Sequence, residues 1–294
     1  MQVSPLSDIC GVRVEGVDLA GPRSPDGDLA LRRIFDEHGL VLFPGQALTK
    51  PQLVAAGDIF GGAMRERSAV ATDPEAPGIS VLSNRGYGGD IVPDDLEAVA
   101  AVAEWHTDQG YLTAPARGKM LYCVLAPEEG GMTGFIDGHA TYDALPDRLK
   151  ARLEGLHVTQ SWLQNQAPNT DAARLRLKGE VLVNSRFPDT VYPIVQSHPV
   201  TGRKVLHFPK LWATGILEVP GEAGEALMAE LLAHIYQPRF IYWHHYQPGD
   251  AIMWDNWRMA HAASGVKNRY PRTLWAMTLK PGPEFGRLLD SQAA

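Results

Sequence analysis

The residues of this chain that are best suited to chemistry lie in the stretch Trp105-His106-Thr107-Asp108. His106 and Asp108 are two positions apart, so in an extended segment their side chains leave the same face. An imidazole nitrogen and a carboxylate oxygen that point into one space offer two ligands to a divalent metal ion. A third could come from His261, far downstream. Two histidines and one carboxylate, with other metal positions open, are typical of non-haem Fe(II) oxygenases, although the short pattern H-x-D alone is common by chance.

A second candidate is Arg272, which begins a predicted strand at 272–279. Period-two alternation places Arg272 on one face with Leu274, Ala276 and Thr278, while the opposite face has the character of core. Burying an unpaired guanidinium is costly, so an arginine on a small, apolar face needs a reason. Its planar fork suits a carboxylate bound through two hydrogen bonds. The alternative is an internal salt bridge to an aspartate or glutamate.

Most of the elements that must position these residues are short strands bounded by glycine and proline. This pattern predicts a mostly β fold with helical cover (α+β), built as one barrel or sandwich. The strands at 119–126 and 133–137 are expected to pair as a hairpin. We expect strands at 10–19, 40–43, 79–82, 119–126, 133–137, 192–195, 204–208, 240–246, 251–254 and 272–279, and helices at 28–38, 51–60, 145–156, 171–178 and 222–236.

No repeat, low-complexity tract or linker divides the chain, so we predict one domain over residues 1–294. Residues 85–103, rich in glycine, proline and acidic side chains, directly precede the H-x-D pattern. They form either a surface loop with a short helix or a lid over a pocket. The polar segment 161–183 is expected to be an insertion.

The composition is that of an ordinary globular protein, with 45% hydrophobic and 21% charged residues. A net charge of -7 without a basic run disfavours nucleic acid or an anionic membrane as a partner, whereas a homo-oligomer is compatible with it. No signal peptide or membrane-spanning apolar run is found, and Cys10 and Cys123 lie far apart in the sequence. We therefore expect a cytoplasmic location.

The other histidines are expected to be structural. On the predicted strand 240–246, His244 and His245 point to opposite faces. His207 is expected to pack within its own strand, although it could face a pocket. Edge or surface positions are expected for His139, His157, His198 and His234.

Longer stretches of the sequence resemble the family of Fe(II)/2-oxoglutarate enzymes that contains the taurine and 2,4-dichlorophenoxyacetate dioxygenases. The resemblance extends over roughly residues 10 to 281, and it is carried by WHTDQGY, APEEGGMTGFID, TYDALPDRLKARLEGL, HPVTGRK, YQPGDAIMWDNWRMAH and RYPRTLW, with GVRVEGVDL and HGLVLFPGQALT similar to the entry strands of that family. It implies a double-stranded β-helix (jelly-roll) core, Fe(II) as the metal and 2-oxoglutarate as the cosubstrate.

The resemblance also implies roles for single residues. His106, Asp108 and His261 would bind the iron. Arg272, helped by the hydroxyl of Thr133, would anchor the distal carboxylate of 2-oxoglutarate. The other end of the cosubstrate would occupy two open metal positions and leave one for O2. The role of Thr133 rests on the resemblance alone.

The chain departs from the family at the positions that hold anionic substrates. Sulfonate-binding members carry a second arginine four residues after the first, where this chain has Ala276, and aryloxyalkanoate members carry one near Thr278. Taurine and simple aryloxyacetates are therefore not expected as substrates. A larger or less anionic molecule could rest on aromatic surface such as Tyr111 and Trp212. Alternatively, an anion could be held elsewhere, by Arg65, Arg67 or Arg85.

The expected reaction is oxidation of an unactivated C–H bond of a small organic molecule, most simply hydroxylation, with release of succinate and CO2. Desaturation stays open. Asp108 argues against a halogenase, where a small residue leaves room for chloride. A zinc hydrolase on the same three ligands would leave Arg272 without a purpose and lacks an obvious general base. If the chain were instead a non-catalytic barrel that binds a small molecule, the joint spacing of the three ligands and Arg272 would be incidental.

Overall fold

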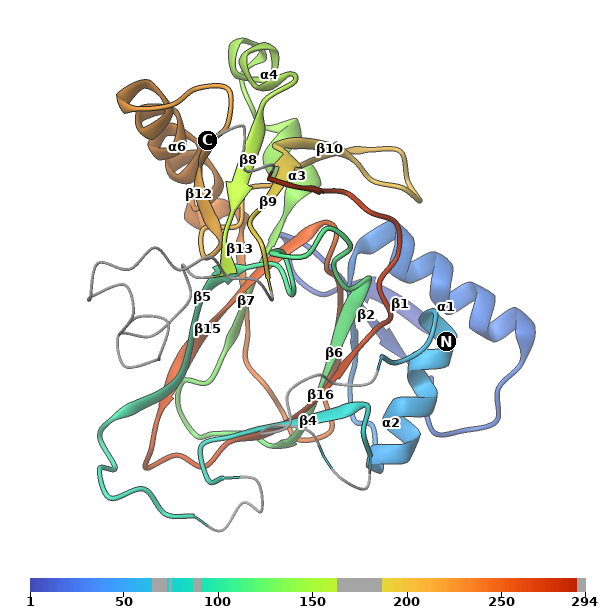
Figure 1. The fold of residues 1–294 in the computed structure, drawn as a ribbon. Helices are drawn as coiled ribbons and strands as arrows, with labels where there is room; N and C mark the ends of the chain where they lie inside the picture. The colour runs from blue at the N-terminus through green and yellow to red at the C-terminus, as the bar shows by residue number, and fades with distance from the viewer. Residues whose placement is uncertain (65–72, 74–75, 87–90, 163–186, 290–294) are drawn as a thin grey trace. The chain divides into compact units, whose positions relative to one another are not determined.

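The structure is a computed structural model that describes residues 1–64, 73, 76–86, 91–162 and 187–289 (Figure 1). The chain divides into two compact units. The first comprises Met1–Glu104, Ala116–Asp137 and Ile241–Pro281, and the second Trp105–Pro115, Gly138–Phe240 and Gly282–Ala294. The prediction of one domain over the whole chain is not tested by this division and stays a prediction.

The first unit contains a seven-stranded sheet in the order β1-β2-β3-β14-β6-β16-β4, of which β1, β2, β6, β16 and β4 are labelled in Figure 1. Its neighbouring strands are antiparallel except β2 and β3, which are parallel. The strands are β1 (Gln2–Pro5), β2 (Val12–Glu15), β3 (Leu40–Phe43), β4 (Ile79–Ser83), β6 (Gly118–Leu125), β14 (Ala251–Asp255) and β16 (Thr273–Thr278).

A second sheet has the order β13-β7-β15-β5. Its strands are β5 (Val99–His106), β7 (Thr133–Asp137), β13 (Ile241–His244) and β15 (Met259–Lys267).

The predicted hairpin between residues 119–126 and 133–137 is wrong. Strand β6 pairs with β14 and β16 in the first sheet, whereas β7 pairs with β13 and β15 in the second. Most residues of β6 and all of β7 are buried, so each strand needs two hydrogen-bonded neighbours rather than one. The connecting turn, with Gly130 and Gly131 at positive φ, takes the chain from one sheet to the other.

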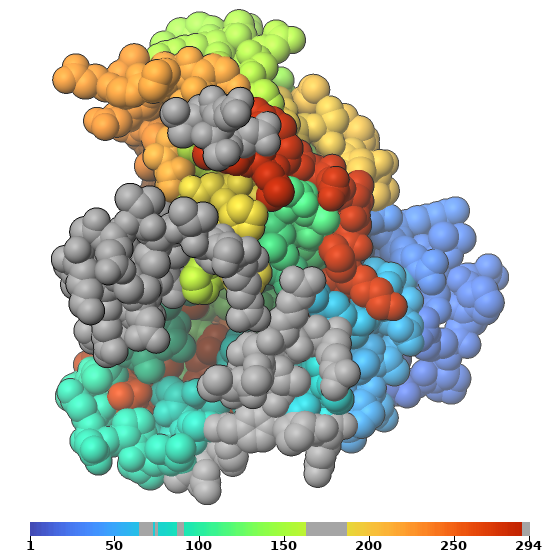
Figure 2. All heavy atoms as spheres, viewed as in Figure 1, coloured from blue at the N-terminus to red at the C-terminus, as the bar shows by residue number. Residues whose placement is uncertain are grey.

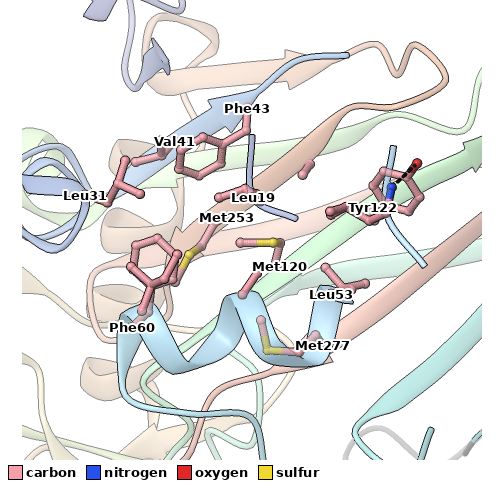
Figure 3. Close-up of a cluster of buried hydrophobic side chains, with 14 of the residues drawn as sticks. Leu19, Leu31, Val41, Phe43, Leu53, Phe60, Met120, Tyr122, Met253 and Met277 are labelled. Atoms are coloured by element: carbon pink, nitrogen blue, oxygen red, sulfur yellow. Dashed lines mark hydrogen bonds between the residues drawn. The ribbon is translucent and has the colours of Figure 1, made fainter. Parts of the chain in front are cut away.

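Period-two alternation sends the side chains of the seven-stranded sheet into two hydrophobic clusters. On β14, Met253 joins the cluster shown in Figure 3, together with residues of the helices α1 (Pro25–His38) and α2 (Lys50–Ala56) and the 3-10 turn η1 (Gly57–Phe60). Its neighbour Trp254 joins the other cluster, with Phe135 of β7 and Met259 of β15. Helices therefore cover one face of this sheet and the second sheet packs on the other, as the α+β prediction requires.

The first N-terminal helix ends at His38 as predicted but begins at Pro25 rather than at residue 28, and the second begins at Lys50, one residue before the predicted start. Ser24 Oγ accepts a hydrogen bond from Gly27 N at the start of α1, and Gly39, with φ 71°, ends it. Figure 2 shows α1 (blue) at the surface, in keeping with its mostly exposed polar face. A capping box between Thr49 and Gln52 starts α2. The predicted helix at 51–60 is split into α2 and the tighter turn η1.

The second unit holds two small sheets and three helices in its described part. The sheets have the orders β12-β8-β9-β17 and β10-β11. The elements are β8 (His157–Gln160), β9 (Thr190–Pro193), β10 (Val195–Ser197), β11 (Lys204–Leu206), β12 (Ala213–Ile216), β17 (Arg287–Leu288), α3 (Gly138–Asp143), α4 (Asp147–Leu153), α6 (Glu222–Ile235) and the 3-10 turn η3 (Pro238–Phe240).

Two predicted segments are only partly described. The helix at 171–178 and the insertion from 163 onwards lie outside the described residues. In its described part, 85–86 and 91–103, the predicted lid forms no helix, and its last residues belong to β5. Its function as a lid stays a prediction. Among the described residues, no helix has the length and apolar character needed to cross a bilayer.

Several histidine predictions need correction. His139, His198 and His234 are buried rather than exposed. His139 Nδ1 lies 2.7 Å from the carbonyl oxygen of Lys204, and His234 Nε2 lies 2.8 Å from that of Thr141. A main-chain partner satisfies each ring and so makes its burial tolerable, which the sequence pattern does not reveal.

Candidate metal centre

The H-x-D pattern lies where a strand gives way to a turn. His106 is the last residue of β5, and β5 is the hydrogen-bonded neighbour of β15, which carries His261. Beyond it the chain turns, with a hydrogen bond from Gly110 N to Thr107 O (3.2 Å) and Gln109 in the left-handed region at φ 58°. The pairing of β5 with β15 therefore joins two strands that are far apart in the sequence and that each carry one of the predicted ligands.

The three predicted ligands are grouped. One ligand atom each of His106, Asp108 and His261 lies within 4.8 Å of the others. His261 is 6% exposed, and the other two side chains are half-buried. Two imidazoles and one carboxylate are the donor set that suits Fe(II) with open positions. No second group of this kind is found in the described part of the chain.

The ring of His261 is held by its neighbours in the first unit. His261 pairs with Phe135 of β7 across the sheet, and its ring centroid lies 4.6 Å from that of Trp254 on β14. Both aromatic residues are almost completely buried. Their packing restricts the rotamers that the histidine can adopt, which favours a fixed imidazole.

Aromatic rings gather beside His106 in the second unit. The rings of His106 and Trp212 meet edge to face at 6.2 Å, and the Trp212 indole donates a hydrogen bond to Thr107 O (2.9 Å). Tyr111 lies 4.9 Å from Trp212 and 5.1 Å from Phe187, between ring centroids. Both predicted aromatic residues therefore lie near the metal motif. Phe187 was missed, because nothing in the surrounding sequence marks it.

Arg272 directly precedes β16 and is 5% exposed. Its Nε donates to the carbonyl oxygen of Gly131 (3.0 Å), and its main-chain N–H donates to Asn84 Oδ1 (2.9 Å). No carboxylate of the described residues pairs with the guanidinium, so the salt-bridge alternative finds no support there. Burial lowers the pKa of Arg272. A buried guanidinium without a carboxylate partner among the described residues favours the binding of an anionic ligand.

Thr133 and Arg272 both contact Tyr246, a residue that was not predicted from the sequence to belong to the site. Thr133 Oγ1 is 2.9 Å from the hydroxyl oxygen of Tyr246, and both residues are buried. The ring centroid of Tyr246 lies 5.7 Å from Cζ of Arg272. The only sequence signal was the position of Tyr246 at the end of the predicted strand 240–246.

On β16, the two positions at which other family members carry a substrate-binding arginine are uncharged in this chain. Ala276 is part of the hydrophobic cluster that contains Trp254, and Thr278 is also buried. Arg85 is half-buried, with Nη2 3.5 Å from the carbonyl oxygen of Arg269. The other two candidate anion-binding arginines, Arg65 and Arg67, lie outside the described residues.

Comparison with known proteins identifies the family. The model of the taurine catabolism dioxygenase TauD, TfdA family matches residues 2–278, so the chain belongs to this family. The (S)-phenoxypropionate/alpha-ketoglutarate-dioxygenase of Sphingobium herbicidovorans is 32% identical over 287 residues, which are 96% of this chain and 95% of that protein.

Two solved structures have the same fold. AAD-2 in complex with Mn(II) and N-oxalylglycine has a TM-score of 0.77 at 26% identity, covering 97% of this chain and 100% of that one. A taurine dioxygenase from Burkholderia xenovorans has a TM-score of 0.78 at 24% identity, covering 99% and 95%.

The family and the names of its members define the class of enzyme. The chain is an alpha-ketoglutarate-dependent dioxygenase, an oxidoreductase that uses Fe(II) and 2-oxoglutarate and acts with O2 on a small molecule. The predicted family, enzyme class and cofactors are thus confirmed.

Proposed function

We propose that His106, Asp108 and His261 bind the iron, and that Arg272 and Thr133 bind the distal carboxylate of 2-oxoglutarate. Two observations support this assignment. The three ligand side chains are grouped within 4.8 Å. The buried guanidinium of Arg272 pairs with no carboxylate of the described residues, and Arg272 and Thr133 both contact Tyr246.

Within this assignment, the protein's own residues orient and shield the reactants. The iron and cosubstrate, when bound, supply O2 activation coupled to decarboxylation of 2-oxoglutarate to succinate and CO2. Arg272 fixes the far end of the cosubstrate with a rigid, directional fork. Trp254 and Phe135 keep water from the buried side of His261. The two facing sheets of the first unit support a double-stranded β-helix core.

The proposed reaction is hydroxylation of an unactivated C–H bond in a molecule that carries an aromatic or extended apolar group. The observation that carries this choice is the cluster of Tyr111, Trp212 and Phe187 beside His106. Uncharged Ala276 stands where sulfonate-binding members carry an arginine. The relative from Sphingobium herbicidovorans, by its name, acts on phenoxypropionate, which carries an aromatic ring. A net charge of -7 further favours a small molecule over nucleic acid as the partner.

A succinate-release screen tests this proposal. Purified enzyme with Fe(II), 2-oxoglutarate and O2 is given sulfonates, aryloxy acids, amino-acid derivatives and neutral aromatics in separate reactions. We expect larger or less anionic aromatic compounds to raise succinate release above the rate without substrate, and taurine and simple aryloxyacetates to leave it unchanged. Mass spectrometry of the product then distinguishes a gain of one oxygen from a loss of two hydrogens. Stimulation by taurine equal to that by aromatic compounds would overturn the substrate assignment.

A further inference from the structure

Tyr246 is a buried residue of the first unit for which neither the sequence analysis nor the proposed site provides a role. It follows β13, and its side chain belongs to the hydrophobic cluster that contains Trp254. Its hydroxyl oxygen is 2.9 Å from Thr133 Oγ1, and its ring lies beside the guanidinium of Arg272, 5.7 Å from Cζ. Both groups proposed to bind the distal carboxylate therefore contact the same tyrosine.

The direction of the hydrogen bond between the two hydroxyls decides what Thr133 can bind. If Thr133 donates to Tyr246, its only proton is used and its lone pairs face any incoming anion. If Tyr246 donates to Thr133, the threonine proton is free. An ionised carboxylate accepts hydrogen bonds and donates none, so only the second arrangement lets Thr133 bind it. Burial raises the pKa of Tyr246, which keeps the donating proton on the phenol.

The ring of Tyr246 is fixed from behind. The ring of His244 packs edge-on against it, with centroids 4.7 Å apart and planes at 88°. His244 is held at both nitrogens, because Nε2 lies 3.1 Å from Asp250 Oδ2 and Nδ1 lies 3.0 Å from the hydroxyl of Tyr242. Since the carboxylate of Asp250 can only accept, Nε2 of His244 donates to it. This support leaves Tyr246 little freedom to turn its hydroxyl away from Thr133.

We propose that Tyr246 is a positioning residue for the cosubstrate: its hydroxyl donates to Thr133 and thereby orients the threonine O–H toward the distal carboxylate of 2-oxoglutarate. The inference rests on the proposed function, because it assumes that Arg272 and Thr133 form the carboxylate anchor. Tyr246 itself contacts neither the iron nor the cosubstrate. It sets the direction in which the hydroxyl of Thr133 donates, and Thr133 binds the cosubstrate.

The test compares Tyr246→Phe with Tyr122→Phe in the full-length protein. Tyr122 is a matched control, because it is also buried and its hydroxyl bonds the main chain of Gln46 and Leu48 in the other cluster (Figure 3). Binding is measured without O2 by tryptophan fluorescence of the Mn(II)-loaded protein. The two probes are 2-oxoglutarate and 2-oxobutyrate, which lacks the distal carboxylate.

We expect Tyr246→Phe to weaken 2-oxoglutarate binding by about 5- to 10-fold, the range for one lost hydrogen bond. Binding of 2-oxobutyrate should stay within about twofold of wild type, because the changed hydrogen bond serves only the missing group. Tyr122→Phe should leave both affinities unchanged. In a double-mutant cycle, Tyr246→Phe should cost little in a Thr133→Val background, since the relay is already broken there.

Three outcomes would overturn the inference: unchanged 2-oxoglutarate binding in Tyr246→Phe, equal weakening of both 2-oxo acids, or additive effects of the two substitutions. Failure of the underlying assignment looks different. If Arg272→Leu also leaves the preference for 2-oxoglutarate over 2-oxobutyrate unchanged, the carboxylate anchor itself is wrong. If Arg272→Leu abolishes that preference while Tyr246→Phe does not change it, only the role of Tyr246 fails.

Discussion

At the scale of single residues, the chain holds a cation in its interior and leaves it without a carboxylate among the described residues. Such a residue lowers the free energy of unfolding unless something compensates for its lost hydration. Gly131 O and the ring of Tyr246 compensate in part. The remaining guanidinium N–H groups are suited to a ligand that brings its own negative charge. Arg272 is thus better explained by ligand binding than by stability.

Arg272→Lys tests this explanation, because it keeps the charge and removes the planar fork. We expect the Kd of 2-oxoglutarate to rise by roughly 30-fold, corresponding to about 2 kcal/mol for a lost charge-assisted pair. Arg269→Lys is the control, since Arg269 is exposed and pairs with Glu97 at the surface. An anaerobic titration of both variants measures the effect. Equal affinities in the two variants would contradict the assignment.

Asp108→Ala tests the metal centre at the same scale. Removal of the only carboxylate among the three proposed ligands should weaken Fe(II) binding by at least about 100-fold, more than the loss of a group that merely orients a ligand. It should also abolish the visible absorption that Fe(II) and 2-oxoglutarate produce together without O2. His245→Ala, at an exposed position, is the control and should bind iron as the wild type does. Retention of stoichiometric iron by Asp108→Ala would remove Asp108 from the site.

At the scale of elements, the turn between β6 and β7 links the two sheets and also braces Arg272. Gly131, with φ 64°, brings its carbonyl oxygen to Arg272 Nε. A Cβ at this position would lie 2.7 Å from Pro127 Cγ and 2.8 Å from Arg272 Cδ. Position 131 therefore requires a glycine for two reasons: its backbone conformation is left-handed, and the side chain of Arg272 approaches it closely.

Gly131→Ala and Gly45→Ala separate these two requirements. Gly45 also has φ 64°, but a Cβ there would meet nothing within 4 Å. Both variants should lose about 1 kcal/mol of folding free energy to left-handed strain. Only Gly131→Ala should in addition displace Arg272 and weaken 2-oxoglutarate binding, by roughly tenfold for an imperfectly placed charged hydrogen bond. Urea unfolding and ligand titration measure the two effects. If the two variants gave the same stability and the same affinity for 2-oxoglutarate, the contact of Gly131 with Arg272 would not contribute to cosubstrate binding.

At the scale of the whole molecule, stability depends on buried polar groups that must stay neutral. His207 is buried beneath Tyr192, with ring centroids 5.1 Å apart, and its Nε2 lies 3.1 Å from Gln160 Nε2. His207 is packed as predicted, but it lies just after β11 (Lys204–Leu206) rather than within the strand. Desolvation lowers the pKa of His207 to about 4. The unfolded chain, with a histidine pKa near 6.5, binds the proton more readily than the folded one.

This difference predicts how stability varies with pH. Because the folded pKa is the lower one, the contribution of neutral His207 is fully present above about pH 6.5 and is lost as the pH falls toward about 4. The loss amounts to about 3 kcal/mol from the size of the shift. Urea unfolding at several pH values should show a steeper decline in wild type than in His207→Gln. Identical slopes would mean that His207 does not titrate differently on folding.

The sequence by itself determined the features that depend on local period and residue type. The spacing of His106 and Asp108, the alternation around Arg272 and the end of the first helix at His38 all depend on a few neighbouring residues. The separation of apolar residues into two faces of one sheet follows from the same period. These features can be predicted because the backbone geometry of a strand or helix turns spacing directly into direction.

Only the tertiary structure decided which elements became neighbours. The expected pairing of β6 with β7 was wrong because both are central strands, and each found partners more distant in the chain. Tyr246 meets Thr133 across 113 positions, and Arg272 meets Gly131 across 141. No local period encodes such contacts, since they depend on sheet order and on the closure of long loops. The ligand types were therefore readable in the sequence, whereas the residues that hold them in place were not.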